Sequence, residues 1–145
     1  MTPDALVFAA ALAGTGAGAL VDLRTRRVPD RVTLALAAAG LALAAAGFGR
    51  VGVVTACAGA LTGLVLMLPG YLFGATGGGD VKLLAAAGTL LGPAGTMWAF
   101  LATLMAGGVL ALVVAARRRR RPEADGSFAY APAIAAGVTL AVVFA

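Results

Sequence analysis

The sequence of 145 residues contains no histidine and a single cysteine, Cys57, which lies inside an apolar run. The absence of histidine excludes Ser/His and Cys/His nucleophile systems and removes the usual zinc ligand. A single cysteine also excludes a disulfide within the chain and a cysteine-based metal site. Carboxylates therefore remain as the natural acid and base, and we expect no metal and no other cofactor.

Charged residues are scarce, at 12% of the sequence, whereas hydrophobic residues make up 61%. A soluble domain has about a quarter charged residues and about half apolar residues. The composition therefore predicts an all-α protein that crosses a membrane several times. The net charge of +5 comes from cations beside apolar segments, so it indicates topology and surrounding lipid and does not indicate binding to nucleic acid.

Apolar runs of membrane-spanning length divide the chain. Helices of roughly 17 to 25 residues cross the hydrocarbon core. Three runs have about this length, namely Ala5 to Val21, Val32 to Phe48 and Val51 to Phe73. A last run, Phe128 to Ala145, follows a charged loop near the end of the chain.

The run from Val81 to Ala116 is too long for one span. Its 36 residues would form a helix of roughly 54 Å, whereas the hydrocarbon core is about 30 Å thick. We therefore expect two short helices that turn near Gly92 and Pro93. The whole chain, residues 1–145, then forms one bundle of about six transmembrane helices without a separate soluble domain.

The positive charges predict the orientation of this bundle. Ten of the eleven cations fall in odd-numbered loops, and only Arg50 does not. Because cytoplasmic loops are rich in Lys and Arg, the odd loops are expected inside and both termini outside. The ten cations are Arg24, Arg26, Arg27, Arg31, Lys82 and the run Arg117 to Arg121.

Small residues in the apolar runs indicate where helices pack. Gly14 and Gly18 in the first run, and Gly59 and Gly63 in the third, have the spacing that lets two helix backbones approach closely in lipid. We interpret these glycines as packing positions.

Two aspartates stand at the ends of apolar runs, on the side predicted to be cytoplasmic. Asp80 follows Gly77, Gly78 and Gly79, and Asp22 ends the first run. Ionisable groups at membrane depth are costly and usually mark a functional site. When two aspartates approach closely, one holds a proton and the other acts as a base, so the pair can activate water and protonate a leaving amine. The glycines would permit positive φ angles and a close approach of substrate.

Three motifs in order carry a family resemblance, namely Asp22-Leu-Arg-Thr-Arg-Arg-Val-Pro-Asp30, Gly77-Gly-Gly-Asp-Val-Lys-Leu83 and Tyr130-Ala-Pro-Ala-Ile134. With them the chain resembles the type IV prepilin peptidases, and more narrowly the short form that serves tight-adherence pili. The resemblance implies a GxGD aspartyl protease of the inner membrane that removes the leader from Flp-like prepilins at the cytoplasmic face. It also implies that Asp22 and Asp80 are the catalytic pair.

Long members of this family carry an additional cytoplasmic domain with paired cysteines and also methylate the new pilin N-terminus. The longest polar stretch here, Arg117 to Ser127, has 11 residues. A domain needs roughly 40 residues to fold even with the help of metals or disulfides. We therefore expect cleavage without methylation. The sequence does not indicate the particular pilin or the oligomeric state.

Other roles fit the same residues. Asp80 also fits as the N-cap of a helix that begins at Val81, and Asp30 fits as the N-cap of the second span. Asp22 can neutralise the arginines of the first loop. Lys82 can serve as one more inside-positive charge, bias the ionisation of the aspartate pair, or meet a substrate carboxylate.

Two other functions use the same features. A small ion-coupled transporter would use the two carboxylates as a proton or sodium site, although such a site belongs nearer the middle of the bilayer. A non-enzymatic membrane subunit would use the glycines for packing alone, but this reading gives no reason for both acids to face the same side.

Overall fold

The computed structural model describes residues 3–25, 29–48, 51–74, 76–120 and 131–144. This part of the chain is entirely helical and contains no strand, in agreement with the all-α prediction. The five helices are α1 (Pro3–Thr25), α2 (Asp30–Ala45), α3 (Val53–Leu72), α4 (Gly78–Arg120) and α5 (Ala131–Phe144). The charged loop expected before the last span falls largely on residues 121–130, which lie outside the described residues.

α4 is divided by a sharp turn at Gly92. The φ and ψ angles of Gly92 are 67° and 179°, a conformation that is essentially restricted to glycine. Pro93 follows directly and suits the first position of a new helix, because its missing N–H has no intrahelical partner there. α4 therefore consists of two segments, which we call the first arm (residues 78–91) and the second arm (residues 93–120).

The two arms of α4 run in opposite directions. A Cβ added to Gly88 would lie 3.0 Å from the hydroxyl oxygen of Thr96. Residues eight apart in a straight helix are separated by about 12 Å, so the chain must reverse between them. The predicted turn near Gly92 and Pro93 is confirmed.

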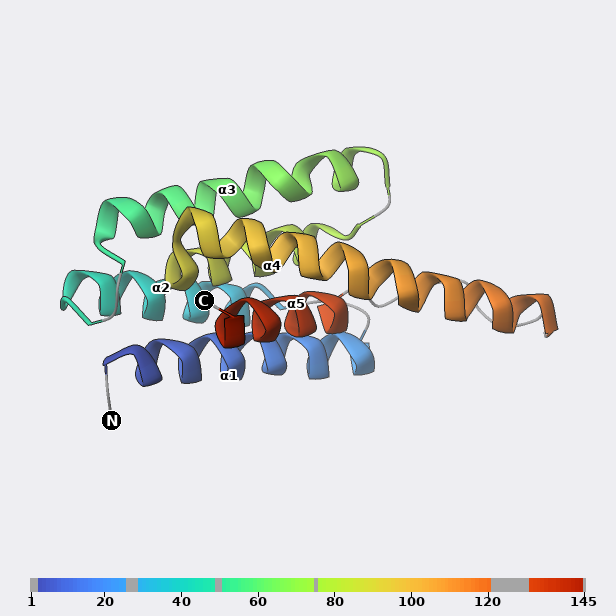
Figure 1. Cartoon of the computed structure of the whole chain (residues 1–145), viewed down its shortest axis with the longest axis horizontal. Helices are drawn as coiled ribbons and strands as arrows, with labels where there is room; N and C mark the ends of the chain where they lie inside the picture. Colours follow the sequence, from blue (N-terminus) through green and yellow to red (C-terminus); the bar gives the residue numbers. More distant parts are fainter. Residues whose placement is uncertain (1–2, 26–28, 49–50, 75, 121–130, 145) are drawn as a thin grey trace.

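The helical segments alternate in direction along the chain (Figure 1). α1, α3 and the second arm of α4 run one way, and α2, the first arm and α5 run back. The start of α1 and the end of α5 lie toward the same end of the bundle, opposite the end at which α1 passes to α2 and α3 to α4. The second arm extends beyond the other helices at this opposite end.

The first arm of α4 occupies the centre of the bundle. Its buried side chains include Leu83, Leu84, Ala87 and Leu90, none of which is more than 3% exposed. α2, α3 and the second arm pack around it. The first turn of the arm, which carries Asp80, is therefore held by neighbours on several sides.

Glycines make the close contacts between these helices. A Cβ on Gly63 would lie 2.9 Å from the Cα atom of Ala85, and one on Gly14 would overlap the side chain of Leu36. Gly59 and Gly18 are similarly close to the first arm. The prediction that these glycines serve packing is confirmed.

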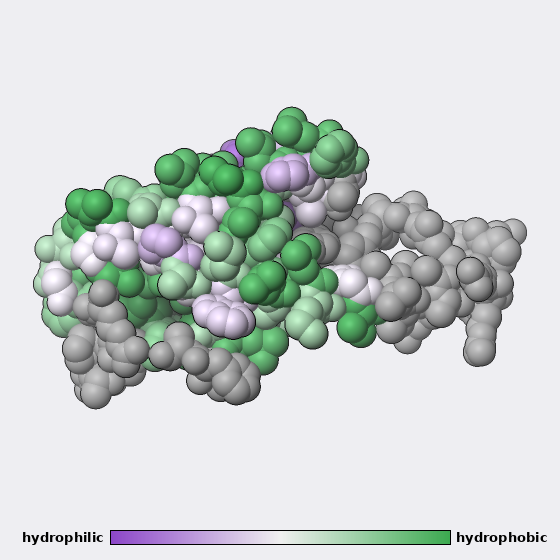
Figure 2. Space-filling view, turned by 45° about the horizontal axis from the view of Figure 1, so that its top comes forward, coloured by the Kyte–Doolittle hydropathy of each residue, from purple (hydrophilic) through white to green (hydrophobic). Residues whose placement is uncertain are grey.

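Many large hydrophobic side chains are exposed on the bundle, as is expected of a membrane protein. Figure 2 shows one face on which hydrophobic side chains predominate. Val53–Leu72 is long and apolar enough to cross a membrane, and Gly78–Val109 reaches such a length only when it is counted across the turn at Gly92. Val7–Asp22 and Pro132–Val142 are shorter apolar helices. Only 22% of the most apolar stretch of α3 is buried inside the bundle, whereas a core helix of a soluble protein is mostly buried. The large exposed hydrophobic residues of α3 include Val54, Leu61, Val65 and Leu72.

Candidate active site

Asp22 and Asp80 come together at one end of the bundle. Asp22 lies in the last turn of α1 and Asp80 in the first turn of α4. Their side chains are buried, with exposed fractions of 6% and 7%. The two carboxyl groups are near enough for the charge of Asp22 to act on Asp80. The structure thus joins the two acids that the sequence separates by 58 positions.

Packing between α1 and α4 explains why the two aspartates meet. Gly18 precedes Asp22 by one turn, and Leu83 follows Asp80 by one turn. A Cβ on Gly18 would lie 3.0 Å from the Cδ1 atom of Leu83. Because α1 and the first arm run in opposite directions, this contact places both aspartates on the same side of it, toward the same end of the bundle.

Asp80 also stabilises the start of its own helix. The backbone N–H of Gly77 donates a hydrogen bond of 3.1 Å to Oδ2 of Asp80. Asp80 is the third residue of α4, which begins at Gly78, so the prediction that it is the N-cap of a helix beginning at Val81 is wrong. A side chain at this third position that reaches back to the preceding N–H is one half of a capping box.

Of the glycines before Asp80, Gly77 is the one whose small size the structure requires. A Cβ on Gly77 would lie 3.2 Å from Oδ2 of Asp80, and one on Gly78 would lie 3.4 Å from the ring of Tyr71. Gly78 and Gly79 belong to the first turn of α4. In this region the positive φ angle lies at Gly74, so the expectation of positive φ at the three glycines is wrong.

One carboxylate oxygen of Asp22 is buried without a partner. Among the described residues, no hydrogen bond to Oδ2 of Asp22 is formed. Leaving such a polar atom unsatisfied is costly, and a catalytic role is one of the recognised reasons for it. This oxygen can accept a proton.

Lys82 is paired with Asp30 of α2. Nζ of Lys82 lies 2.7 Å from Oδ1 of Asp30. Because side chains two positions apart on a helix do not face each other, Lys82 and Asp80 point in different directions. Asp30 is the first residue of α2 after the N-cap residue Pro29, so the prediction that Asp30 caps this helix is wrong.

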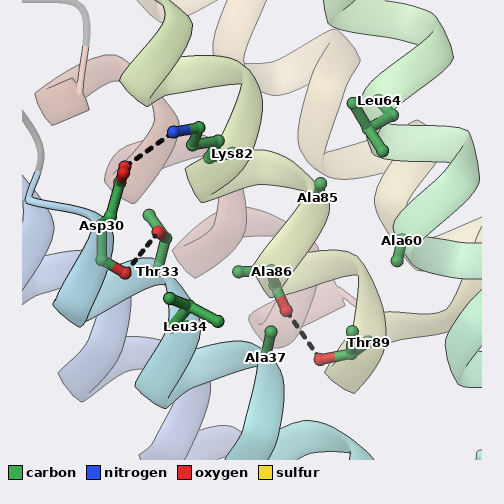
Figure 3. A pocket seen from close by; sticks show the side chains of 10 residues that line it. All are labelled: Asp30, Thr33, Leu34, Ala37, Ala60, Leu64, Lys82, Ala85, Ala86 and Thr89. Carbon is green, nitrogen blue, oxygen red and sulfur yellow. Dashed lines mark hydrogen bonds and ion pairs between the residues drawn. The ribbon is translucent and has the colours of Figure 1, made fainter.

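A cavity of about 300 Å³ extends from this ion pair between α2, α3 and the first arm. Figure 3 shows Asp30 and Lys82 facing each other at one end of the cavity and Thr89 toward the other. The remaining lining is apolar or small, with Thr33, Leu34, Ala37, Ala60, Leu64, Ala85 and Ala86.

Thr76 is a half-buried polar residue that the sequence did not single out. Its hydroxyl oxygen is buried without a hydrogen-bond partner among the described residues. Its N–H donates a hydrogen bond of 3.2 Å to the carbonyl oxygen of Gly70, so the chain folds back onto the end of α3 before α4 begins. No spacing in the sequence distinguishes this threonine from the others.

The described residues contain no group of three or more His, Cys, Asp or Glu side chains that could hold a metal ion.

Fold and site together define a helical membrane protein with a buried pair of carboxyl groups. The sequence profile of the type IV leader peptidase family matches residues 6–112, a stretch that contains both aspartates. The chain belongs to this family, which makes it a leader peptidase-like protease with prepilin-type substrates. Comparison with curated proteins and with solved structures gave no match.

Proposed function

We propose that this protein is an aspartyl endopeptidase that removes the leader peptide from Flp-like type IV prepilins, with Asp22 and Asp80 as its catalytic pair. The observation that carries the proposal is the approach of two buried carboxyl groups from α1 and α4 in a chain of the leader peptidase family. Two such groups hold one proton between them, because both cannot ionise at short distance.

The pair supplies both an acid and a base for hydrolysis. The ionised carboxylate takes a proton from water, whose oxygen attacks the carbonyl carbon of the scissile peptide bond. The protonated carboxyl group donates its proton to the carbonyl oxygen, which gives a tetrahedral intermediate. When the C–N bond breaks, the leaving nitrogen takes the proton that the pair holds, and a hydroxyl group of the intermediate gives its proton to the other carboxylate, so the pair again holds one proton.

Gly77, Gly78 and Gly79 shape this site. Gly77 leaves room for the carboxyl group of Asp80 and donates the hydrogen bond that orients it. A carboxyl group held in this way loses little freedom when the reaction begins, which favours catalysis.

The proposed enzyme crosses the inner membrane six times, with both termini outside and the site at the cytoplasmic face. The alternating direction of the six helical segments supports this topology. The cations support the orientation, because ten of eleven lie in the loops that it places inside.

We do not propose the ion-coupled transporter predicted as an alternative from the sequence. Its carboxylates should lie near the middle of the bilayer. Asp22 and Asp80 lie instead in terminal turns of α1 and α4.

The test is cleavage by the purified protein. The protein is incubated in detergent micelles with a Flp-like prepilin, and the new N-terminus is identified by mass spectrometry. We expect leader removal that survives a metal chelator and reagents against serine and cysteine proteases. Absence of cleavage by wild-type protein, or loss of cleavage on chelation, would contradict the proposal.

A further inference from the structure

The ion pair between Asp30 and Lys82 joins the two segments that carry the candidate catalytic residues. Lys82 follows Asp80 by two positions in the first turn of α4. Asp30 begins α2, after the short connection that follows the last turn of α1 and Asp22. The ion pair therefore joins two residues that are 52 positions apart in the sequence. Asp30 is close in sequence to Asp22, and Lys82 is close in sequence to Asp80.

The first two turns of α4 are held on two sides. Leu83 packs against Gly18 of α1, on the side where Asp80 is buried. Lys82 points to α2 and meets Asp30, and Figure 3 shows this contact at the end of the cavity. α1 thus contacts this part of α4 directly, whereas α2 contacts it through the ion pair.

Apolar contacts hold these helices farther along the bundle. α1 and α2 meet at Gly14, which lies two turns from Asp22, at about 12 Å along the helix. α2 and the first arm meet where Gly40 of α2 contacts Thr89 of α4. Gly40 lies about 15 Å along α2 from Asp30. In lipid there is no hydrophobic force between helices, so their ends are held by direct packing and polar contacts. The ion pair is a polar contact of this kind at the end that carries the site.

We propose that Asp30 and Lys82 are positioning residues, whose ion pair ties the start of α2 to the start of α4 and so sets the separation of Asp22 and Asp80. This inference rests on the proposed function. Neither residue touches the reacting atoms. The pair acts by holding the two catalytic carboxyl groups in register, and a small displacement of catalytic groups is enough to slow a reaction severalfold or more.

The experiment compares kcat and KM for prepilin cleavage by purified variants. Because both side chains are more than half exposed, Asp30→Asn and Lys82→Met should each lower kcat by about twofold to fivefold, with KM changed by less than about twofold. Lys82→Arg keeps the charge and should keep most of the activity. Arg31→Met, which removes a neighbouring exposed cation on α2, is the matched control and should leave kcat near the wild-type value.

Exchanging the two charges distinguishes the effect of the ion pair on kcat from the effects of the two residues taken singly. The single reversals Asp30→Lys and Lys82→Asp should be more damaging than the neutral variants, and the double variant should recover activity relative to each reversal. Raising the salt concentration from about 0.05 M to about 0.5 M should lower kcat of the wild-type protein but not that of Lys82→Met, because salt screens an exposed ion pair.

Several outcomes overturn the inference. Wild-type kcat in both neutral variants would show that the pair does not position the site. The same conclusion would follow if the fold-losses in kcat of the two single reversals multiplied in the double variant. A rise in KM at constant kcat would make the pair a binding contact. If wild-type protein cleaves prepilin while Asp22→Asn does not, these results count against the positioning role alone. If wild-type protein does not cleave, the proposed function fails as well.

Discussion

Gly59 of α3 and Gly88 of α4 face each other so closely that a Cβ added to either residue would overlap the carbonyl oxygen of the other. Both contacts involve backbone atoms, which cannot move aside as a flexible side chain can. A Cβ on Gly59 would also lie 2.8 Å from the Cα atom of Gly92. α3 is therefore held directly against the turn of α4 and the arm that carries Asp80.

Substitution at this contact should destabilise the bundle. We expect Gly59→Ala to lower the free energy of unfolding by about 1 to 3 kcal/mol, because the added methyl group has no space. Unfolding in mixed micelles, followed by circular dichroism, measures this change. Gly16→Ala is the matched control, since nothing lies within 4 Å of its Cβ position. Equal stability of Gly59→Ala and wild type would show that the two backbones are farther apart.

The turn between the arms of α4 should depend on glycine at position 92. Its φ of 67° combined with a ψ of 179° is a conformation that other residues avoid. We expect Gly92→Ala to cost about 1 to 3 kcal/mol in the free energy of unfolding. Gly108→Ala, in the second arm, adds a methyl group where nothing lies within 4 Å and should have little effect. A stable Gly92→Ala protein would argue against this backbone conformation.

Removing either candidate catalytic carboxyl group should abolish leader removal. Asp22→Asn and Asp80→Asn should each lower kcat by at least about a thousandfold, because an acid and a base are both required and the losses are not additive. Asp22→Glu and Asp80→Glu should also fail, since one methylene displaces the reacting oxygen. Prepilin processing is measured by mass spectrometry of the product, with the amount of each variant in the membrane measured in parallel.

Asp30→Asn is the control for these changes. It removes an acid that is exposed and lies close in the chain to Asp22. Its expected loss of about twofold to fivefold is much smaller than that of a catalytic aspartate. Normal processing by Asp22→Asn or Asp80→Asn would exclude the catalytic pair.

The proposed orientation predicts a pattern of chemical labelling. In a Cys57→Ala background, cysteines introduced at Thr25 and at Ser127 should resist a membrane-impermeant thiol reagent added to intact cells. A cysteine at Gly49 should react with it. The reason is the distribution of cations, which places the first and fifth loops inside. Ser127 and Gly49 lie outside the described residues, so labelling tests the orientation independently of the structure.

Permeabilised cells provide the labelling control, because all three cysteines should then react. Labelling of Ser127 from outside in intact cells would rule out the six-span topology. That topology requires the chain to turn between the two arms of α4.

Much of this architecture could be predicted because it depends on local sequence. The run of 36 apolar residues exceeds one span, and Pro93 after Gly92 is a strong signal for a turn within it. Asp22 and Asp80 could be singled out through the family motifs that contain them, because Asp4 and Asp30 also lie beside apolar runs and position alone does not distinguish the four acids. The spacing of Gly59 and Gly63 indicated a helix contact, although it did not identify the partner helix.

The ion pair of Asp30 with Lys82 could not be predicted in the same way. The two residues are 52 positions apart, and the sequence does not say which cation faces which acid. The start of α4 was misplaced because Gly78 and Gly79 are poor helix formers, and the hydrogen bond from Gly77 to Asp80 is made only once the chain has folded. Contacts between helices in the folded protein determine which charged residues pair and where α4 begins.

The short first arm of α4 determines the depth at which the site lies. Gly59 is level with Gly88, and Gly63 with Ala85, so in this antiparallel register Asp80 is level with Leu68 of α3. α3 continues to Leu72, about one further turn or 5 to 6 Å. Asp80 therefore lies about one helical turn inside the end of α3, where its side chain is buried. In the proposed reaction, water and the scissile peptide bond must both reach this depth for the carboxyl group to act on them.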